Sequence, residues 1–205
     1  MRKIETLFER IKGSPLVKAV VTQGCEWVLE GAGIATEKFD GTCCAIIGGR
    51  LYKRHALKQN KTVPKEWLHW SFNPEQKSGH GWSPVSPTDS SDQYHREAGN
   101  LLNESLVLED GTYELVGPKI QKNPYNLERH ELWQHGSTRP GSITPIEWKP
   151  FSTSINGKLD IEYELGALRD YLAKRDMEGL VFHHPNGQMA KVKRRDFGFP
   201  WPCGK

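Results

Sequence analysis

The sequence predicts a single α+β domain built mainly from antiparallel strands. Three observations lead to this prediction: short runs with β-strand character, glycine turns between them, and one clearly amphipathic helical segment late in the chain. With 205 residues and 36% hydrophobic content, the chain can bury one sizeable core but is short for two full domains. We therefore expect one domain over residues 1–205, with a long loop or insertion at about 58–92.

In the first half of the chain, the apolar pattern predicts a helix followed by a meander of strands. The apolar residues of 4–11 recur at helical spacing, so a short amphipathic helix is expected there. Strands are expected at 16–22, 27–30, 35–39, 42–47 and 50–54, with Gly48-Gly49 as a hairpin turn. Residues 58–91 lack periodicity and are rich in Trp, Pro, Ser and Gly, which indicates a long surface segment.

The second half of the chain predicts two helices and further strands. Helices are expected near 93–103 and at 161–174, where the apolar residues form one stripe and Asp160 is well placed as the N-cap. Strands are expected at 112–116, 131–135 and 146–151, with a loop at 122–130. A closing hairpin pairs 179–183 with 188–192 across Pro185-Asn186-Gly187.

Composition restricts the class of protein. No apolar run has membrane-spanning length, and Glu5 stands where the apolar core of a signal peptide would begin. We therefore expect a monomeric intracellular protein without a membrane partner, in the cytoplasm, with the nucleus as a second possibility. The net charge of +3 does not by itself indicate nucleic acid, although basic residues gather at 191–195. The four cysteines lack the spacing of metal ligands and are interpreted as reduced thiols.

The residue of strongest chemical interest is Lys38, at the end of the predicted strand 35–39 and just before Asp40-Gly41. A lysine amine attacks phosphorus only when it is neutral, so a nucleophilic lysine needs burial or neighbouring cations. The same string also fits an ordinary surface lysine beside a turn, which is the commoner case for an isolated motif.

Three further elements contain the other residue types that nucleotidyl transfer needs. Glu114 lies within a predicted strand and suits hydrogen bonds from sugar hydroxyls, although a solvated edge glutamate fits equally well. Glu178 precedes an apolar strand and suits a divalent cation; an exposed acid in a turn is the alternative. Lys191 and Lys193 share one face of a strand, where they would clamp a phosphate or guard a sheet edge.

In this order, the four elements resemble motifs I, III, IV and V of the covalent nucleotidyltransferases. This superfamily comprises the ATP-dependent DNA and RNA ligases and the GTP-dependent mRNA capping enzymes. The matching strings are Lys38–Gly41, Tyr113–Gly117, Glu178–Val181 and Lys191–Lys193. Within the superfamily, the small 5′ to 3′ RNA ligases related to a human RNA ligase are similar to the fuller strings Glu37–Cys44, Leu51–Arg54, Glu114–Lys119 and Lys193–Trp201.

The resemblance implies an ATP-dependent RNA ligase, which forms phosphodiester bonds. It implies an adenylation domain of antiparallel β-sheets with flanking helices, in an ATP-grasp-like ligase core, and we expect no OB-fold domain. Lys38 would attack the α-phosphate of ATP, with Mg²⁺ or Mn²⁺ bound, to give lysyl-AMP and pyrophosphate. The AMP would pass to an RNA 5′-phosphate, and an RNA 3′-hydroxyl would displace it to seal the strand.

The resemblance also gives each site residue a role. Lys38 is the catalytic nucleophile, and Glu178 serves the metal ion. Nucleotide binding is assigned to Glu37, Asp40, Gly41, Arg54, Glu114, Lys191 and Lys193. Of these, Arg54 and Glu114 would hold the ribose, and the two lysines would contact the α-phosphate. Trp148 and Phe151 are candidates for stacking on adenine, with core packing as the other role of either.

Two other functions remain open from the sequence. One is a capping-type guanylyltransferase, and the other is a catalytically silent module that binds nucleotide or RNA ends. RNA contacts would come from the irregular segment and the helix after it, through Trp67, Trp70, Trp82, Tyr94, His95 and Arg96. The same aromatic residues could equally form a packed lid with buried tryptophans.

Overall fold

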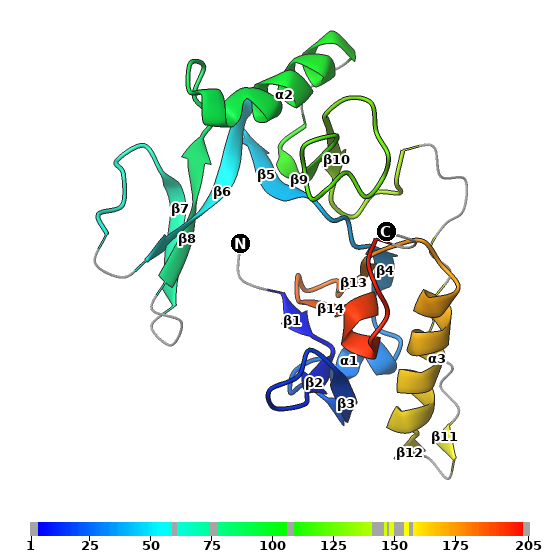
Figure 1. Ribbon diagram of the computed structural model, residues 1–205. Helices are drawn as coiled ribbons and strands as arrows, with labels where there is room; N and C mark the ends of the chain where they lie inside the picture. The colour runs from blue at the N-terminus through cyan, green and yellow to red at the C-terminus, as the bar shows by residue number, and fades with distance from the viewer. Residues whose placement is uncertain are drawn as a thin grey trace. The chain divides into compact units, whose positions relative to one another are not determined.

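The computed structural model describes residues 4–58, 61–73, 78–105, 109–140, 146, 148–149, 154–155 and 158–202. The fold is mixed α+β with mostly antiparallel strands, as the sequence predicts (Figure 1). The contacts between residues divide the chain into two compact units, which are described in turn. The first contains Asp40–His135, and the second contains Lys3–Phe39 together with Gly136–Lys205. A single nucleotidyltransferase domain stays a prediction.

A six-stranded antiparallel sheet forms the first unit, in the order β10-β9-β5-β6-β8-β7. Its strands are β5 (Thr42–Ile47), β6 (Arg50–Lys58), β7 (Leu68–Asn73), β8 (Ser78–Pro84), β9 (Gly111–Val116) and β10 (Glu131–Gln134). Gly48 and Gly49 connect β5 to β6, and both have a positive φ, which glycine adopts without strain. The predicted hairpin is therefore confirmed.

The segment 58–92 is not the long irregular loop that its composition predicts. It contains β7 and β8, and β8 pairs along β6 from Tyr52, opposite Pro84, to Lys58, opposite Ser78. Trp82 in β8 is buried against Tyr52. Glycine, serine and proline make up much of β8, so its strand signal is weak in the sequence even though the pairing is continuous.

One helix of the first unit, α2 (Gln93–Ser105), covers a face of this sheet, and the 3₁₀ turn Ser90–Asp92 precedes it. The core on this face consists of Cys44, Ile46, Ala98, Tyr113, Leu115 and Leu132. Because side chains alternate along a strand, the neighbours of Cys44 and Tyr113 lie on the opposite face. Cys43 and Glu114 are those neighbours, and they lie directly opposite each other on β5 and β9.

A four-stranded sheet organises the second unit, in the order β1-β14-β13-β4. Its strands are β1 (Glu5–Thr6), β4 (Ile34–Glu37), β13 (Gly179–His183) and β14 (Met189–Lys193); β1 runs parallel to β14, and the other pairs are antiparallel. Two small antiparallel pairs are β2 (Phe8–Arg10) with β3 (Val17–Val21), and β11 (Ser154–Ile155) with β12 (Lys158–Leu159). The helices are α1 (Glu26–Leu29), α3 (Ile161–Ala173) and the 3₁₀ turn Arg194–Phe197.

The helix α3 begins and packs as predicted. The Oδ1 atom of Asp160 accepts a hydrogen bond from the Tyr163 backbone N–H at 3.0 Å, which caps the first turn. Leu168 and Leu172 are fully buried in a core that also contains Leu180. α3 therefore covers one face of the four-stranded sheet. Neither α3 nor any other helix in the described part of the chain is long and apolar enough to cross a membrane.

Two local predictions near the N-terminus are wrong. Residues 4–11 form β1 and β2 rather than a helix, and the Leu7 N–H donates to Lys191 O at 2.8 Å. The spacing of apolar residues within a short segment does not indicate that the segment pairs with a distant strand. Residues 27–29 lie in α1 and are buried, because a short run of consecutive apolar residues fits a buried helix as well as a buried strand. The strand predicted at 146–151 lies largely outside the described residues.

Gly179 is required where β13 and β14 approach each other. A Cβ atom there would lie 2.1 Å from Val192 O and 2.8 Å from Lys193 Cα, so the two backbones would have to separate. We expect Gly179→Ala to lower the free energy of unfolding by about 1–3 kcal/mol, measured by urea denaturation. The matched control is Gly166→Ala in α3, where the added Cβ meets nothing within 4 Å and alanine favours the helix. Equal losses in both variants would contradict this prediction.

Candidate functional site

The predicted nucleophile and the two downstream lysines lie on one face of the four-stranded sheet. Lys38 directly follows β4, and its backbone N–H donates to Gly179 O at 2.9 Å, so it continues the pairing with β13. Gly179 lies opposite Lys193 on β14. Lys191 and Lys193 alternate with fully buried residues of the same strand. All three lysines therefore point away from the core beneath α3. For Lys191 and Lys193, this is the arrangement that the two-residue period of a strand predicts.

Glu178 bridges two of these lysines. Its Oε2 is 2.5 Å from Lys38 Nζ, and its Oε1 is 2.6 Å from Lys193 Nζ. Lys38 Nζ also donates to Phe39 O at 3.0 Å. The Glu178 side chain is only 7% exposed, and the two lysine side chains are 20% and 18% exposed. One buried carboxylate thus offsets one of two enclosed positive charges, and the cluster keeps a cationic excess that suits a phosphate group.

Glu178 is the predicted metal ligand. Carboxylate oxygen is the ligand that Mg²⁺ prefers, and Mg²⁺ usually takes one or two carboxylates and completes its shell with water and substrate phosphate oxygens. Both Glu178 oxygens contact lysine Nζ atoms in this structure, so a divalent cation would have to displace at least one of these lysines. The role of Glu178 in metal binding stays a prediction.

The structure places Glu37 on the other face of the sheet from Lys38. Glu37 lies opposite the core residue Leu180, and its Oε2 is 3.5 Å from Arg139 Nε. Its Oε1 is buried without a hydrogen-bond partner among the described residues. Burial raises the pKa of Glu37 to about 7, while Arg139 lowers this pKa and Asp176 raises it. Its role in nucleotide binding stays a prediction.

The raised pKa of Glu37 predicts a pH-dependent stability. A carboxyl group whose pKa rises on folding, from 4.5 to about 7, binds its proton more tightly in the folded protein. Its contribution is therefore present below about pH 4.5 and is lost as the pH rises through about 7. We expect Glu37→Gln to be more stable than the wild type by on the order of 1–3 kcal/mol at about pH 8, with a much smaller difference at about pH 4.

Urea denaturation at both pH values measures this difference. The control is Glu30→Gln, which removes an exposed carboxylate near α1 and should shift stability equally at the two pH values. A Glu37→Gln variant whose stability changes with pH as much as that of the wild type would rule out the raised pKa of the buried Glu37 carboxyl.

In the first unit, Glu114 holds a network of polar contacts. Its Oε1 accepts the Gly41 backbone N–H at 3.0 Å, and its Oε2 lies 2.8 Å from His135 Nε2. Gly41 approaches β9 so closely that a Cβ atom would lie 2.2 Å from Leu115 O. The neighbouring Asp40 N–H donates to Tyr125 Oη at 2.7 Å. The structure therefore brings Gly41 and Glu114 into direct contact.

Arg54 shares the sheet face of Glu114. Alternation along β5 and β6 puts Arg54 on the same face as Tyr52, which lies opposite Ala45. The Arg54 Nε is buried and has no hydrogen-bond partner within the described ranges. Burial lowers the pKa of the nearby His80, and the positive charge of Arg54 lowers it further. The Nε–H of Arg54 is a hydrogen-bond donor without a partner among the described residues, and the predicted ribose contact of Arg54 stays a prediction.

Several polar partners at these positions were not predicted. His135 contacts Glu114, Tyr125 contacts the Asp40 backbone, and Arg139 contacts Glu37. Each contact joins segments that are far apart in the sequence, and none of the three residues belongs to a recognisable motif. The pairing of β10 with β9 brings His135 to Glu114, whereas Tyr125 and Arg139 reach their partners from loops.

Most of the predicted RNA-contact residues are packed in the structure. Trp82 and His95 are buried. Arg96 donates to the carbonyl oxygens of Ser86 and Asp89 at 2.8 Å and 2.6 Å. Tyr94 stacks on His130 with ring centroids 4.3 Å apart, and Trp67 packs against His55. The side chain of Trp70 lies outside the described residues. Trp82 and His95 are therefore packed within the first unit, and a contact of this segment with RNA stays a prediction.

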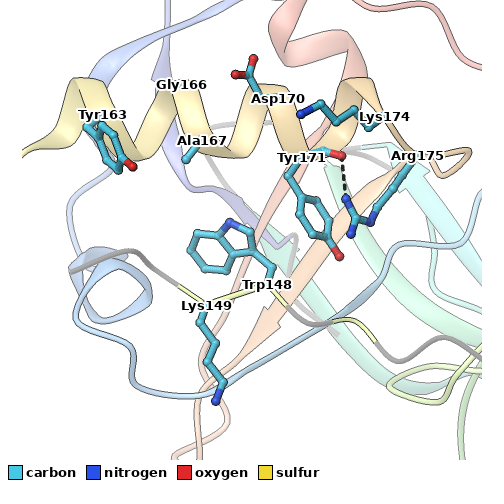
Figure 2. Close-up of a pocket in the computed structure, with 9 residues that line it drawn as sticks. All are labelled: Trp148, Lys149, Tyr163, Gly166, Ala167, Asp170, Tyr171, Lys174 and Arg175. Atoms are coloured by element: carbon cyan, nitrogen blue, oxygen red, sulfur yellow. Dashed lines mark hydrogen bonds between the residues drawn. The ribbon is translucent and has the colours of Figure 1, made fainter. Parts of the chain in front are cut away.

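A hollow of about 530 Å³ lies against α3 (Figure 2). Trp148, Tyr163 and Tyr171 line it together with basic side chains that include Lys174 and Arg175. Trp148 also packs against the core residue Phe182, with ring centroids 5.1 Å apart. Because Lys38 points to the other face of the sheet, Trp148 does not lie where it could stack on a base held at Lys38. Core packing is the role that the structure shows for Trp148, and Phe151 lies outside the described residues.

An α+β chain with a carboxylate between two lysines on one sheet face has the charge arrangement of a site that handles phosphate. Comparison with known proteins makes the relationship more specific. The chain is 24% identical to RNA ligase 1 of Rattus norvegicus, over 82% of the chain and 68% of that protein. The RNA ligase 1 proteins of Danio rerio and Mus musculus match with the same identity and coverage. No protein-family model matches the chain.

The chain is therefore a distant relative of RNA ligase 1, and the predicted resemblance to RNA ligases is confirmed.

Proposed function

We propose that this chain is an ATP-dependent RNA ligase that joins RNA 5′-phosphate and 3′-hydroxyl ends through a lysyl-AMP intermediate on Lys38. The observation that carries the proposal is the bridge from Lys38 through Glu178 to Lys193. These residues come from three separate strings of the resemblance, and they are in direct contact. The distant relationship to RNA ligase 1 supports the same function.

In the first step, Lys38 Nζ attacks the α-phosphorus of ATP. A P–N bond forms, the P–O bond to pyrophosphate breaks, and the amine gives up a proton. Because Nζ is in an ion pair with Glu178, the attack requires that this pair opens and that the ammonium group is deprotonated. Lys193 and Lys191 lie on the same face and would offset the charge that develops on the α-phosphate.

Glu178 would hold Mg²⁺, or Mn²⁺ in its place, and the ion would neutralise part of the triphosphate charge. Both carboxylate oxygens are paired with lysines, so the opening of the Lys38 pair that the attack requires would also free an oxygen for the ion. The resemblance assigns ribose binding to Arg54 and Glu114, and the shape of the nucleotide pocket to Asp40 and Gly41.

In the second step, an oxygen of the RNA 5′-phosphate attacks the same phosphorus. The P–N bond breaks, Lys38 is regenerated, and the RNA end carries AMP through a pyrophosphate bond. In the third step, the RNA 3′-hydroxyl attacks the 5′-phosphate, AMP leaves, and a phosphodiester bond forms. Charge stabilisation by the lysine cluster would serve the phosphorus centre in the first two steps.

Incubation of the full chain with α-labelled ATP and Mg²⁺ tests the first step. We expect label that stays with the protein under denaturing conditions and is discharged by RNA carrying a 5′-phosphate. Absence of label would overturn the proposal, and stronger labelling by GTP would favour a capping-type guanylyltransferase. If the labelled protein left a broken RNA with 5′-phosphate and 3′-hydroxyl ends unsealed, ligase activity would be excluded.

A further inference from the structure

We propose that Cys43, Glu114 and His135 form a binding site for a thiophilic divalent cation, of which Zn²⁺ is the representative. The three residues lie in the first unit and come from β5, from β9 and from the position directly after β10. Binding of the cation does not depend on the proposed ligase function. Its effect on nucleotide, described below, rests on that function, because Glu114 is also the predicted ribose ligand.

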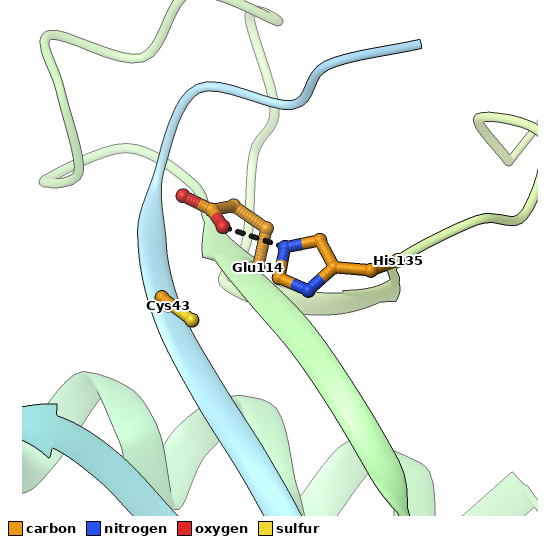
Figure 3. Close-up of side chains that lie close together, drawn as sticks. All are labelled: Cys43, Glu114 and His135. Atoms are coloured by element: carbon orange, nitrogen blue, oxygen red, sulfur yellow. Dashed lines mark hydrogen bonds and ion pairs between the residues drawn. The ribbon is translucent and has the colours of Figure 1, made fainter. Parts of the chain in front are cut away.

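The three side chains converge on one point (Figure 3). Their ligand atoms all lie within 4.8 Å of one another, and His135 Nε2 is 2.8 Å from Glu114 Oε2. In a tetrahedral Zn²⁺ site, neighbouring ligand atoms are about 3.3–3.8 Å apart, since metal–ligand distances are about 2.0–2.3 Å. Side-chain rotations would therefore open the Glu114–His135 pair by about 0.5–1 Å and move the thiol inward by at most about 1.5 Å.

The register of the sheet produces this convergence. Cys43 and Glu114 are directly opposite each other on β5 and β9, and the His135 backbone N–H donates to Thr112 O at 2.9 Å. Thr112 and Glu114 lie on the same face of β9, because they are two residues apart. The spacing of the cysteines in the sequence cannot indicate such a site, since each ligand comes from a different segment.

Hydrogen bonds at atoms that would not bind the metal ion orient the side chains of His135 and Glu114. His135 Nδ1 is 3.0 Å from Thr112 Oγ1, and Glu114 Oε1 is held by the Gly41 N–H. A threonine hydroxyl can accept or donate, so it supports either neutral tautomer of the imidazole. The Nε2 atom can therefore carry a proton towards Glu114 or present its lone pair to a metal ion. Such outer contacts commonly fix the ring orientation of a ligating histidine.

The ligand types select the class of cation. A thiolate, an imidazole and a carboxylate suit Zn²⁺, whereas Mg²⁺ prefers oxygen ligands only. Cys43 is a partly exposed reduced thiol, and the side chains of His135 and Glu114 are 24% and 12% exposed. An ion and one water molecule can therefore reach the site. By contrast, the neighbouring Cys44 is fully buried in the core on the opposite face of β5, so its thiol cannot reach the site.

A metal ion at this site would leave Glu114 fewer carboxylate oxygens to accept hydrogen bonds from a ribose. A metal ion on Oε2 withdraws one carboxylate oxygen from sugar hydroxyls, and the Gly41 N–H already uses the other. The cation should therefore compete with the ribose of the bound nucleotide. Binding also requires the thiolate of Cys43, whose proton goes to the solvent, so affinity should decrease as the pH falls.

Titration of the full chain with Co²⁺, after removal of metals by a chelator, tests binding directly. We expect near-ultraviolet absorption from thiolate-to-cobalt charge transfer, which Zn²⁺ abolishes by displacement. Cys43→Ser should lose this absorption, and the matched variant Cys44→Ala should keep it. Thr112→Val, which keeps the shape but removes the hydroxyl, should weaken Co²⁺ binding by about 10–100-fold.

Two results would overturn the site: no charge-transfer absorption in the wild-type chain, or absorption that persists in Cys43→Ser. Circular dichroism of Cys43→Ser shows whether the variant is folded. His135→Gln provides a second variant, and it should keep the thiol but lose most of the affinity for Zn²⁺.

The effect on nucleotide is measured separately, as labelling by α-labelled ATP with Mg²⁺ in excess. Zn²⁺ should slow labelling of the wild-type chain and have little effect on Cys43→Ser, which labels at the wild-type rate without Zn²⁺. If neither protein is labelled, the proposed ligase function fails while the cobalt titration still decides the metal site. If Zn²⁺ inhibits both proteins equally, competition at this site is excluded.

Discussion

Replacement of Lys38 by arginine is expected to abolish the covalent AMP adduct, with a loss of labelling of at least about 10³-fold. Arginine keeps the positive charge and can still pair with the buried Glu178, so the sheet and the ion pair should survive. A guanidinium group, however, remains protonated and has no lone pair to attack phosphorus. The measurement is protein-bound label after incubation with α-labelled ATP and Mg²⁺.

The matched control is Lys174→Arg, which makes the same change at an exposed lysine directly after α3. It should label as the wild type does. Thermal melting of Lys38→Arg separates a lost nucleophile from a lost fold. Label that persists at the wild-type level in Lys38→Arg would show that another residue carries the nucleotide.

Lys193→Met is expected to slow adduct formation by about 10²–10³-fold, although the nucleophile is intact. Methionine keeps much of the length of the side chain but removes the cation that contacts Glu178 Oε1 at 2.6 Å. The α-phosphate then loses a charge that is held in place before the reaction begins. Single-turnover labelling measures the rate, and Lys193→Arg, which restores a cation, should recover part of it.

Lys18→Met is the control for the loss of a lysine ion pair. Lys18 pairs with Glu9 at 2.8 Å, but both side chains are nearly half exposed, so this pair should contribute little. Its variant should form the adduct at the wild-type rate. A Lys193→Met variant that also kept the wild-type rate would contradict the assignment of Lys193 to the α-phosphate.

The elements that the sequence predicts well are those with strong local signals. α3 has an N-cap and an apolar stripe, and the β5–β6 and β13–β14 pairs have glycine at their turns. The N-terminal strands were missed because β1 is held by β14, which follows some 180 residues later, and not by its neighbours in the sequence. β8 was missed because glycine and serine give little strand signal, although β6 and β7 pair with it on both sides.

The sequence predicts the position of a site residue where alternation along a strand decides on which face of the sheet its side chain lies. Lys191 and Lys193 lie on one face of β14 for that reason. The contact of Lys193 with Lys38 through Glu178 includes a pair of residues 140 positions apart, and only the resemblance to RNA ligases gave grounds to expect it. The same alternation puts Glu37 on the opposite face from Lys38. His135 was missed because it becomes a partner of Glu114 only when β10 pairs with β9.

The ion pair between Lys38 and Glu178 also has a consequence for the protein at rest. The Lys38 Nζ atom lies 2.5 Å from a buried carboxylate oxygen and 3.0 Å from a carbonyl oxygen, and these two partners restrict the directions from which an electrophile can approach it. Small aldehydes, acyl phosphates and other amine-reactive metabolites would therefore react only slowly with Lys38. Under the proposed function, Glu178 would therefore limit the reaction of Lys38 with other electrophiles before any nucleotide is bound.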